Sequence, residues 1–202
     1  MLVSFTHRFT FLAMPKCAST ALETALGPRM ELQVGATPAD KHMNLRRYDR
    51  QYRRWLEDIA AAPMETVCLF REPVDWLFSW WRYRGRPGIP DKSKSTAQLS
   101  FETFVDHYLD HGTGPSRIGR QSRFVSRPDG QVGVDHLFRY DDIDGLLDWI
   151  GERTGWLIAP DRVNISPAPH QAAALSPALR RRLEDELSAD FRVYETIGRR
   201  PG

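Results

Sequence analysis

The stretch from residue 10 to residue 22 constrains the fold most, because an apolar run, a short polar loop and a helical pattern follow one another there. The apolar run ends at Pro15, and the helical pattern begins near Ser19. A strand, a loop and a helix in this order direct backbone N–H groups toward one point, which attracts anions. Lys16 adds a positive charge, and Ser19 and Thr20 add hydroxyl groups. A surface corner with a solvated lysine and a serine N-cap has the same pattern, so both interpretations stay open here.

Strands that alternate with helices along the chain predict an α/β fold, with helices on both faces of a mostly parallel sheet in three layers. The expected strands are 9–14, 31–34, 66–70 and 134–140. The expected helices are 19–26, 45–59, 73–83, 101–109, a short one within 115–127, 143–150, 177–187 and 191–197. Residues 84–99 are expected to form a surface loop, or a lid over a site. At 202 residues the chain fits a single domain, residues 1–202.

The composition argues against several classes of protein. Hydrophobic residues make up 41% and aromatic residues 11% of the chain, which disordered proteins do not reach. The net charge of +2 gives no reason to expect a nucleic-acid partner. No apolar run approaches the roughly 20 residues of a membrane span, and the N-terminal region lacks the pattern of a signal peptide. We therefore predict a cytoplasmic protein with no membrane partner, and its oligomeric state stays open.

The two cysteines, Cys17 and Cys68, are too few for a disulfide framework and do not indicate a metal site. Free thiols fit a reducing compartment. Cys17 lies in the polar loop, where a helix N-terminus can lower the pKa of a thiol and make it reactive. We expect instead that Cys17 contributes its backbone N–H group, and that Cys68 belongs to the core.

A dense group of arginines lies on one face of the helix that Asn44 can cap. We expect the opposite face to be buried, and its residues are Leu45, Tyr48, Tyr52, Trp55, Leu56 and Ile59. The arginines are Arg46, Arg47, Arg50, Arg53 and Arg54. They form either a solvated face or a surface for an acidic acceptor.

A second strand end carries another group that suits an anion. The expected strand 66–70 is followed by Arg71, and Ser79 lies two helical turns further along the helix that Pro73 begins. Arginine offers a rigid fork for phosphate, and a serine hydroxyl can complete the shell. Because ligands of parallel sheets bind beyond the carboxyl ends of the strands, the two strand ends together predict a ligand with two separated anionic groups.

The two motifs resemble those of the sulfotransferases that use 3′-phosphoadenosine 5′-phosphosulfate (PAPS). Residues 15–20, Pro-Lys-Cys-Ala-Ser-Thr, are similar to the family's 5′-phosphosulfate loop. Arg71, followed eight positions later by Ser79, is similar to its 3′-phosphate motif. Ala18 in place of Gly is similar to the carbohydrate 2-O-sulfotransferase branch. Weaker similarities are Gln121, residues 137–140, Asn164 to Ser166, and Asp190-Phe191 with Tyr194.

This resemblance implies a P-loop-like sulfotransferase fold and a role for each motif. Lys16, Ser19, Thr20 and the loop amides of Cys17 and Ala18 would hold the 5′-phosphosulfate, and Lys16 would stabilise the leaving group. Alanine at position 18 requires, in this picture, a backbone that avoids positive φ.

Arg71 and Ser79 would hold the 3′-phosphate by the same resemblance. Structural roles are the alternatives: a surface position for Lys16, an ion pair of Arg71 with Glu72 or Asp75, and a buried helix position for Ser79.

Transfer to a hydroxyl group requires a general base, and histidine suits that role near neutral pH. His42 is our candidate, because it lies between the two motifs and the pair Lys41-His42 resembles a Lys-His or Gly-His pair of many sulfotransferases. Glu23 and Asp40 are lesser candidates. His170 could border the site, and the histidines interpreted as structural are His7, His107, His111 and His136.

The sequence therefore predicts an enzyme that moves a sulfuryl group from PAPS, without a metal, to a hydroxyl group of a carbohydrate or small-molecule acceptor. The acceptor itself stays open. The aromatic cluster of Trp76, Trp80 and Trp81 would suit a sugar or an aromatic polyol equally, although Trp80 and Trp81 suit packing better than a sugar platform. A P-loop kinase or nucleotidase of atypical sequence is an alternative, although such loops carry their Lys at the end of a Gly-rich loop. A non-catalytic nucleotide-binding relative is another.

Overall fold

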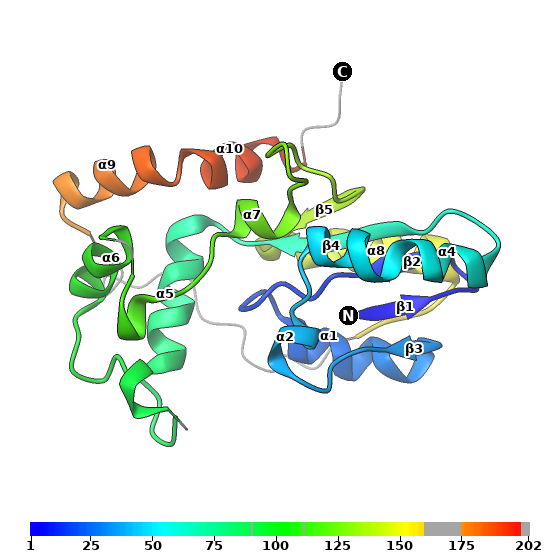
Figure 1. The fold of residues 1–202 in the computed structure, drawn as a ribbon, viewed down its shortest axis with the longest axis horizontal. Coiled ribbons are helices and arrows are strands. Elements are labelled where there is room, and N and C mark those ends of the chain that lie inside the picture. Colours follow the sequence, from blue (N-terminus) through cyan, green and yellow to red (C-terminus); the bar gives the residue numbers. More distant parts are fainter. Residues whose placement is uncertain (90, 111, 160–174, 199–202) are drawn as a thin grey trace.

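A five-stranded mixed sheet forms the centre of the computed structural model (Figure 1), which describes residues 1–89, 91–110, 112–159 and 175–198. The strands of this part of the chain stand in the order β3-β1-β2-β4-β5. Their bounds are Leu2–Ser4 (β1), Phe9–Phe11 (β2), Leu32–Gln33 (β3), Glu65–Phe70 (β4) and His136–Arg139 (β5). β2, β4 and β5 pair in parallel, whereas β1 is antiparallel to both β2 and β3. The predicted α/β class is confirmed.

The strand β1 was absent from the sequence-based prediction, which began the sheet at residue 9. Leu2 pairs with Phe11 and Ser4 with Phe9, so the chain enters the sheet as a tight hairpin. A strand of three residues is too short to show an alternating pattern. The turn between β1 and β2 includes Arg8 at φ 56°, and His7 lies in this turn instead of in a strand.

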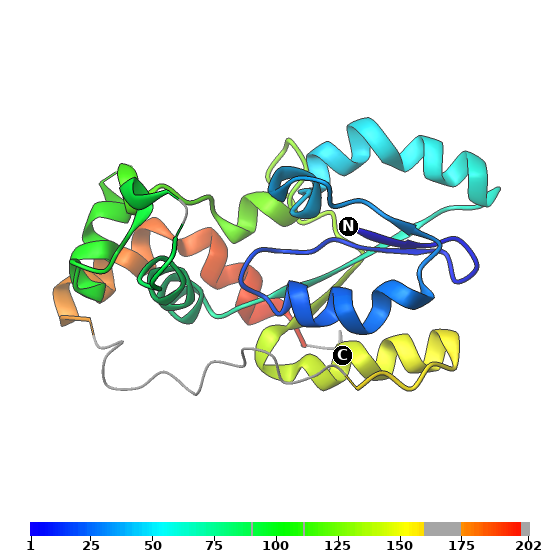
Figure 2. The same cartoon turned by 90° about the horizontal axis from the view of Figure 1, so that it is seen from below.

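Helices flank the sheet on both faces, as predicted. Figures 1 and 2 together show α3 and α4 over one face, and α1 and α8 over the other. The helices α5, α6 and α9 lie beyond the carboxyl end of β4. The bounds are Ser19–Leu26 (α1), Pro38–Lys41 (α2), Leu45–Tyr48 (α3), Arg54–Ala60 (α4), Pro73–Arg84 (α5), Phe101–Leu109 (α6), Gln121–Val125 (α7), Ile143–Thr154 (α8), Pro177–Glu186 (α9) and Ser188–Thr196 (α10).

The core lies between the sheet and these helices. Every residue of β2, and the run from Thr66 to Phe70 in β4, is buried, as expected for strands covered on both faces. On α5 the buried residues include Val74, Leu77 and Phe78.

The helix after Asn44 departs from the predicted buried stripe. Residues Asp49–Arg53 form a π-helical turn between α3 and α4, which adds backbone to the turn and rotates the residues that follow. Leu45, Tyr48 and Leu56 are buried as predicted. Trp55 and Ile59 are instead 50% and 52% exposed, because a constant period of 3.6 residues does not hold across the π turn.

Three of the five arginines of this helix bind groups of the same chain. Arg47 pairs with Asp40 at 2.7 Å, and Arg53 pairs with Asp49 at 2.7 Å. Arg46 donates to the carbonyl oxygens of residues 126 and 127. These contacts give the arginines a structural use, and none of them lines the main cavity described below.

The loop that follows α5 is hydrogen-bonded to that helix through Thr96. Thr96, which is buried, donates its hydroxyl hydrogen to the carbonyl oxygen of Trp81 at 2.6 Å. Its N–H group donates to the carbonyl oxygen of Arg84 at 3.1 Å. A short 3₁₀ turn covers Lys92–Lys94. A surface loop is therefore confirmed, and of its described residues only Arg86 reaches the main cavity.

Several predicted positions fall outside the described residues. These are Asn164, Ser166, His170 and His111. Within the described ranges, no helix has the combination of length and apolar composition needed to cross a membrane.

The cap of α3 provides a test of the local fold. Oδ1 of Asn44 accepts a hydrogen bond of 2.9 Å from the N–H group of Arg47. We expect Asn44→Ala to lower the free energy of unfolding by about 1 kcal/mol, because this N–H loses its partner. Asn44→Asp, which keeps the accepting oxygen, should change it much less. Urea unfolding followed by circular dichroism measures both, and equal losses would contradict the assignment.

Candidate functional site

The two predicted motifs meet at one edge of the sheet. β2 and β4 are neighbours and run in parallel, so the loop after Phe11 and the helix after Phe70 begin side by side. A cavity of about 580 Å³ opens there. The predicted residues that line it are Lys16, Ala18, Ser19, Thr20, His42, Arg71 and Ser79. The sequence thus predicted this grouping correctly, with Cys17 as the exception.

Cys17 is fully buried behind the loop. Its thiol lies 3.8 Å from Oε1 of Gln121, and burial raises its pKa to about 12. The thiol is therefore protonated and unreactive at neutral pH, which argues against a reactive Cys17. That Cys17 contributes its backbone N–H group stays a prediction. Cys68 is buried in the core, as predicted.

The loop conformation contradicts one prediction. Ala18 has φ 53° and ψ 16°, in the left-handed region that the prediction required it to avoid. Lys16 also has a positive φ of 66°, whereas Cys17 between them does not. The reason is geometric: the chain must reverse sharply between β2 and α1, and left-handed residues make this turn. Turns that alternate in this way form concave nests of N–H groups that bind anions.

Two carbonyl groups of the loop accept hydrogen bonds, one from α5 and one from Arg71, which precedes that helix. The indole N–H of Trp76 donates to the carbonyl oxygen of Pro15 at 2.9 Å. Nη1 of Arg71 donates to the carbonyl oxygen of Lys16, also at 2.9 Å. No side chain caps the N-terminus of α1, so the N–H groups of its first turn are available to a ligand.

Lys16 is a partly buried cation. Its Nζ lies 4.1 Å from the centre of the Tyr83 ring, a cation–π distance. Burial, and after it the neighbouring charges of Arg86 and Arg71, together lower the pKa of Lys16 to about 8. An anion in the cavity would reverse this effect, because it favours the charged amine.

Arg71 is buried at the end of β4 and carries an ion pair. Its Nε lies 2.5 Å from Oδ2 of Asp75, so the ion pair that we considered as an alternative role is present. Its guanidinium carbon also lies 4.1 Å from the centre of the Tyr140 ring. These contacts hold the fork in one position at the cavity wall. Ser79, also buried, lines the cavity from α5.

His42 lines the same cavity with a defined tautomer. Nδ1 lies 2.7 Å from the carbonyl oxygen of Ala13. Because a carbonyl oxygen only accepts, Nδ1 carries the hydrogen, and Nε2 of the neutral ring is unprotonated. Burial lowers the pKa of His42 below its ordinary value of 6.5. The ring is therefore a neutral base at pH 7.

The lesser base candidates are engaged elsewhere. Glu23 forms an ion pair with Lys41, whose Nζ also donates to Oγ1 of Thr20 at 3.3 Å. Asp40 is paired with Arg47 and accepts the hydroxyl hydrogen of Thr37. Neither carboxylate lines the cavity.

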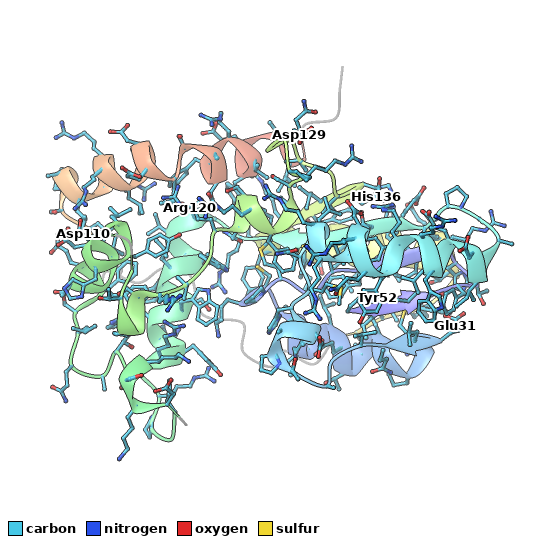
Figure 3. The ribbon with its side chains drawn as sticks, viewed as in Figure 1. Glu31, Tyr52, Asp110, Arg120, Asp129 and His136 are labelled. Carbon is cyan, nitrogen blue, oxygen red and sulfur yellow. The ribbon has the colours of Figure 1, made fainter. Side chains whose placement is uncertain are left out.

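The other described histidines lie outside the cavity. His136 is on β5 (Figure 3), 3.2 Å from Oε2 of Glu65. His7 packs edge-on against Trp156, and His107 lies on α6. Their structural interpretation agrees with these positions.

The charge of the cavity is one-sided. Its charged residues in the described ranges are Lys16, Lys41, Arg71 and Arg86, and no carboxylate lines it there. The counterions Asp75 and Glu23 stand behind two of these cations. Such a wall favours an anionic ligand.

Sequence reasoning missed part of the lining. Tyr83 follows Ser79 by four positions, so helical spacing alone places it on the same face of α5. Arg86 lies just beyond the end of that helix and also lines the cavity. Residues 35–38 also line the cavity, and they belong to no sequence motif that could have predicted this position. Trp81 donates to a carbonyl group and packs in the fold, as expected. Trp80, for which packing was also expected, lines the cavity, and Trp76 donates to the carbonyl oxygen of Pro15.

Two further cavities lie among the helices. One of about 430 Å³ lies between α6 and α9, where Arg182 pairs with Asp106 at 2.8 Å. The other, of about 220 Å³, lies beside Arg117, Arg120 and Arg123. Neither contains a residue predicted for the site.

A comparison with models of protein families finds no match for this chain, and neither does a comparison with curated protein sequences.

The strained loop gives a prediction for position 18. We expect Ala18→Gly to stabilise the protein, by up to about 1.5 kcal/mol. Glycine removes a left-handed penalty of about 1–2 kcal/mol but adds backbone freedom to the unfolded chain, which offsets about 0.5–1 kcal/mol. The control is Ala25→Gly inside α1, which should cost about 1 kcal/mol. If urea unfolding shows equal losses for both variants, the left-handed assignment is wrong.

Proposed function

We propose that this protein is a sulfotransferase that uses PAPS as its donor, with the P-loop-like fold of that family. The single observation that carries the proposal is the meeting of two anion-binding motifs in one cavity that has cations but no described carboxylate in its wall. Two anionic ends in one ligand require this arrangement. The resemblance of residues 15–20 and of Arg71 with Ser79 to the family's motifs supplies the identity of the ligand.

The residues present fit this donor. The nest of loop N–H groups, the first turn of α1 and the Lys16 amine suit the 5′-phosphosulfate. Ser19 and Thr20 add hydroxyl groups to that end of the cavity. Arg71 and Ser79 suit the 3′-phosphate, because a fixed guanidinium fork and a hydroxyl group match phosphate oxygens.

The donor would supply the sulfuryl group. The chain's own part is to stabilise charge and to move one proton. Lys16 in its charged form and the fixed loop amides stabilise the negative charge that develops on the 5′-phosphate side, and one such donor is worth about 2.7–4 kcal/mol. His42 takes the hydrogen of the acceptor hydroxyl group on Nε2, the unprotonated nitrogen.

The acceptor is proposed only as a hydroxyl-bearing molecule such as a carbohydrate. We place the acceptor against the part of the cavity that residues 35–38 and His42 line, because the proposed base must reach the acceptor hydroxyl group. No metal has a part in these steps.

The first test concerns donor binding. We expect 3′-phosphoadenosine 5′-phosphate to bind in isothermal titration, and Arg71→Ala to weaken binding at least about tenfold, because one charged hydrogen-bonding partner is worth about 1.5–3 kcal/mol.

Binding should also weaken as pH rises above about 8, where free Lys16 loses its charge. Lys16→Arg should remove this pH dependence. The ligand's phosphates are fully ionised in that range, so they do not contribute.

Absence of binding, or binding that Arg71→Ala leaves unchanged, would count against the proposal. Turnover of ATP with magnesium would favour the kinase or nucleotidase alternative.

The second test concerns the base. We expect His42→Gln to lower kcat by about 10²–10⁴-fold while donor binding stays unchanged, because only proton removal is lost. In the wild type, the acid limb of the rate profile should lie below pH 6.5, since His42 has a lowered pKa and is lost as a base only when protonated. The control is His107→Gln, on α6 away from the cavity.

Donor binding without product in the wild type, together with an indifferent His42→Gln, would favour the non-catalytic alternative.

A further inference from the structure

The side-chain amide of Gln121 is bonded to the main chain of Arg71 through both of its polar atoms. Oε1 accepts from the Arg71 N–H group at 3.0 Å, and Nε2 donates to the Arg71 carbonyl oxygen at 2.8 Å. Gln121 is only 1% exposed, and it is not among the described residues that line the cavity. Oε1 also receives the weaker S–H donor of Cys17. One amide therefore touches both motifs from behind.

The position of Arg71 explains why this amide matters. The last pair of the β4–β5 ladder joins Phe70 to Arg139, so Arg71 lies one residue beyond it. A buried N–H and a buried C=O without partners would be costly at that point. The amide offers one acceptor and one donor, as a neighbouring strand would. Gln121 thus extends the hydrogen bonding of β4 by one residue.

The fixed main chain determines where the Arg71 side chain can reach. From there Nη1 bonds to the Lys16 carbonyl group, and Nε bonds to Asp75. A shift of the Arg71 main chain would move the guanidinium fork relative to both the loop and the cavity. The relative position of the two anion-binding motifs therefore depends on Gln121.

The helix that carries Gln121 is itself anchored. α7 is a single short helix, and such helices are not stable alone. Asp190 of α10 is buried and accepts two bonds from Ser122, from the N–H group at 3.0 Å and from the hydroxyl group at 2.7 Å. Arg120, which Figure 3 labels near the C-terminal helices, donates to the carbonyl oxygen of Glu186. The anchoring of Gln121 thus comes from α9 and α10.

We infer that Gln121 is a positioning residue that holds Arg71 in register with the loop of Lys16, and so sets the preference of the site for a ligand with a 3′-phosphate. The ligand preference rests on the proposed function. The hydrogen bonding behind it is a property of the protein alone, and the two parts can be tested separately.

The ligand test compares two nucleotides that differ by one group. The dissociation constants of 3′-phosphoadenosine 5′-phosphate and adenosine 5′-phosphate are measured by titration, and their ratio isolates the 3′-phosphate. We expect Gln121→Met, which has a similar shape but neither hydrogen bond, to reduce this ratio by roughly tenfold, since small misplacements of a binding group have large effects. Gln121→Asn, a milder variant with an amide one carbon shorter, should reduce it in the same direction and by less.

The control is Val125→Ala, which removes buried packing from α7 and keeps both hydrogen bonds between Gln121 and Arg71. It should weaken the fold and leave the ratio unchanged. A ratio unchanged in the Gln121 variants, or reduced equally in Val125→Ala, would overturn the inference.

The second measurement needs no ligand. Amide hydrogen exchange followed by nuclear magnetic resonance reports whether the Arg71 N–H group is protected. We expect exchange at the Arg71 N–H group to become at least about tenfold faster in Gln121→Met or Gln121→Asn. In Val125→Ala it should become faster only as much as the lower free energy of unfolding requires. Unchanged exchange at Arg71 would overturn the positioning role. If the wild type does not prefer the 3′-phosphorylated nucleotide, but exchange at Arg71 responds as expected, the proposed function fails while the positioning role stands.

Discussion

The parallel pairing of β2 with β4 is the interaction on which the site depends. It places two chain segments that lie far apart in the sequence at the same sheet edge, so that Lys16 and Arg71 come within one hydrogen bond of each other. Each segment alone is an ordinary strand end. The ladder between them converts two weak anion-binding signals into one cavity, because parallel strands end on the same side.

The second constraint is electrostatic. Among the described residues, the cavity wall holds cations and no carboxylate, so these cations repel one another. The pKa of Lys16 is lowered by burial and, to a smaller extent, by this repulsion. The chain limits the cost in two ways. Asp75 forms an ion pair with Arg71, and Glu23 forms one with Lys41. The ring of Tyr83 stabilises the charge of Lys16 by a cation–π interaction. The site thus remains attractive to anions while the ligand-free protein tolerates its charges.

Local patterns predicted what local physics determines. Ser19–Leu26 and Phe101–Leu109 coincide with the expected helices, because local signals mark them: apolar spacing in both, the stop at Gly27-Pro28 after the first and the cap Ser100 before the second. The grouping of both motifs followed from the rule for parallel sheets. The left-handed Ala18 and the π turn before Arg54 could not be predicted, since tertiary closure imposes them against local preference. The bonds of Gln121 join residues 50 apart, which no local pattern encodes.

Lys16 also links the folding of the chain to protons, with the opposite sign to ligand binding. Its pKa falls from 10.5 in the unfolded chain to about 8 in the fold, so folding releases a proton between these values. The contribution of this one amine to stability is therefore full above pH 10.5 and lost as pH falls through 8. An anion in the cavity favours the protonated amine instead. At this residue, the pH range that best suits the binding of an anion is the range in which the charged amine destabilises the empty fold most. Anion binding and stability therefore oppose each other at one nitrogen atom.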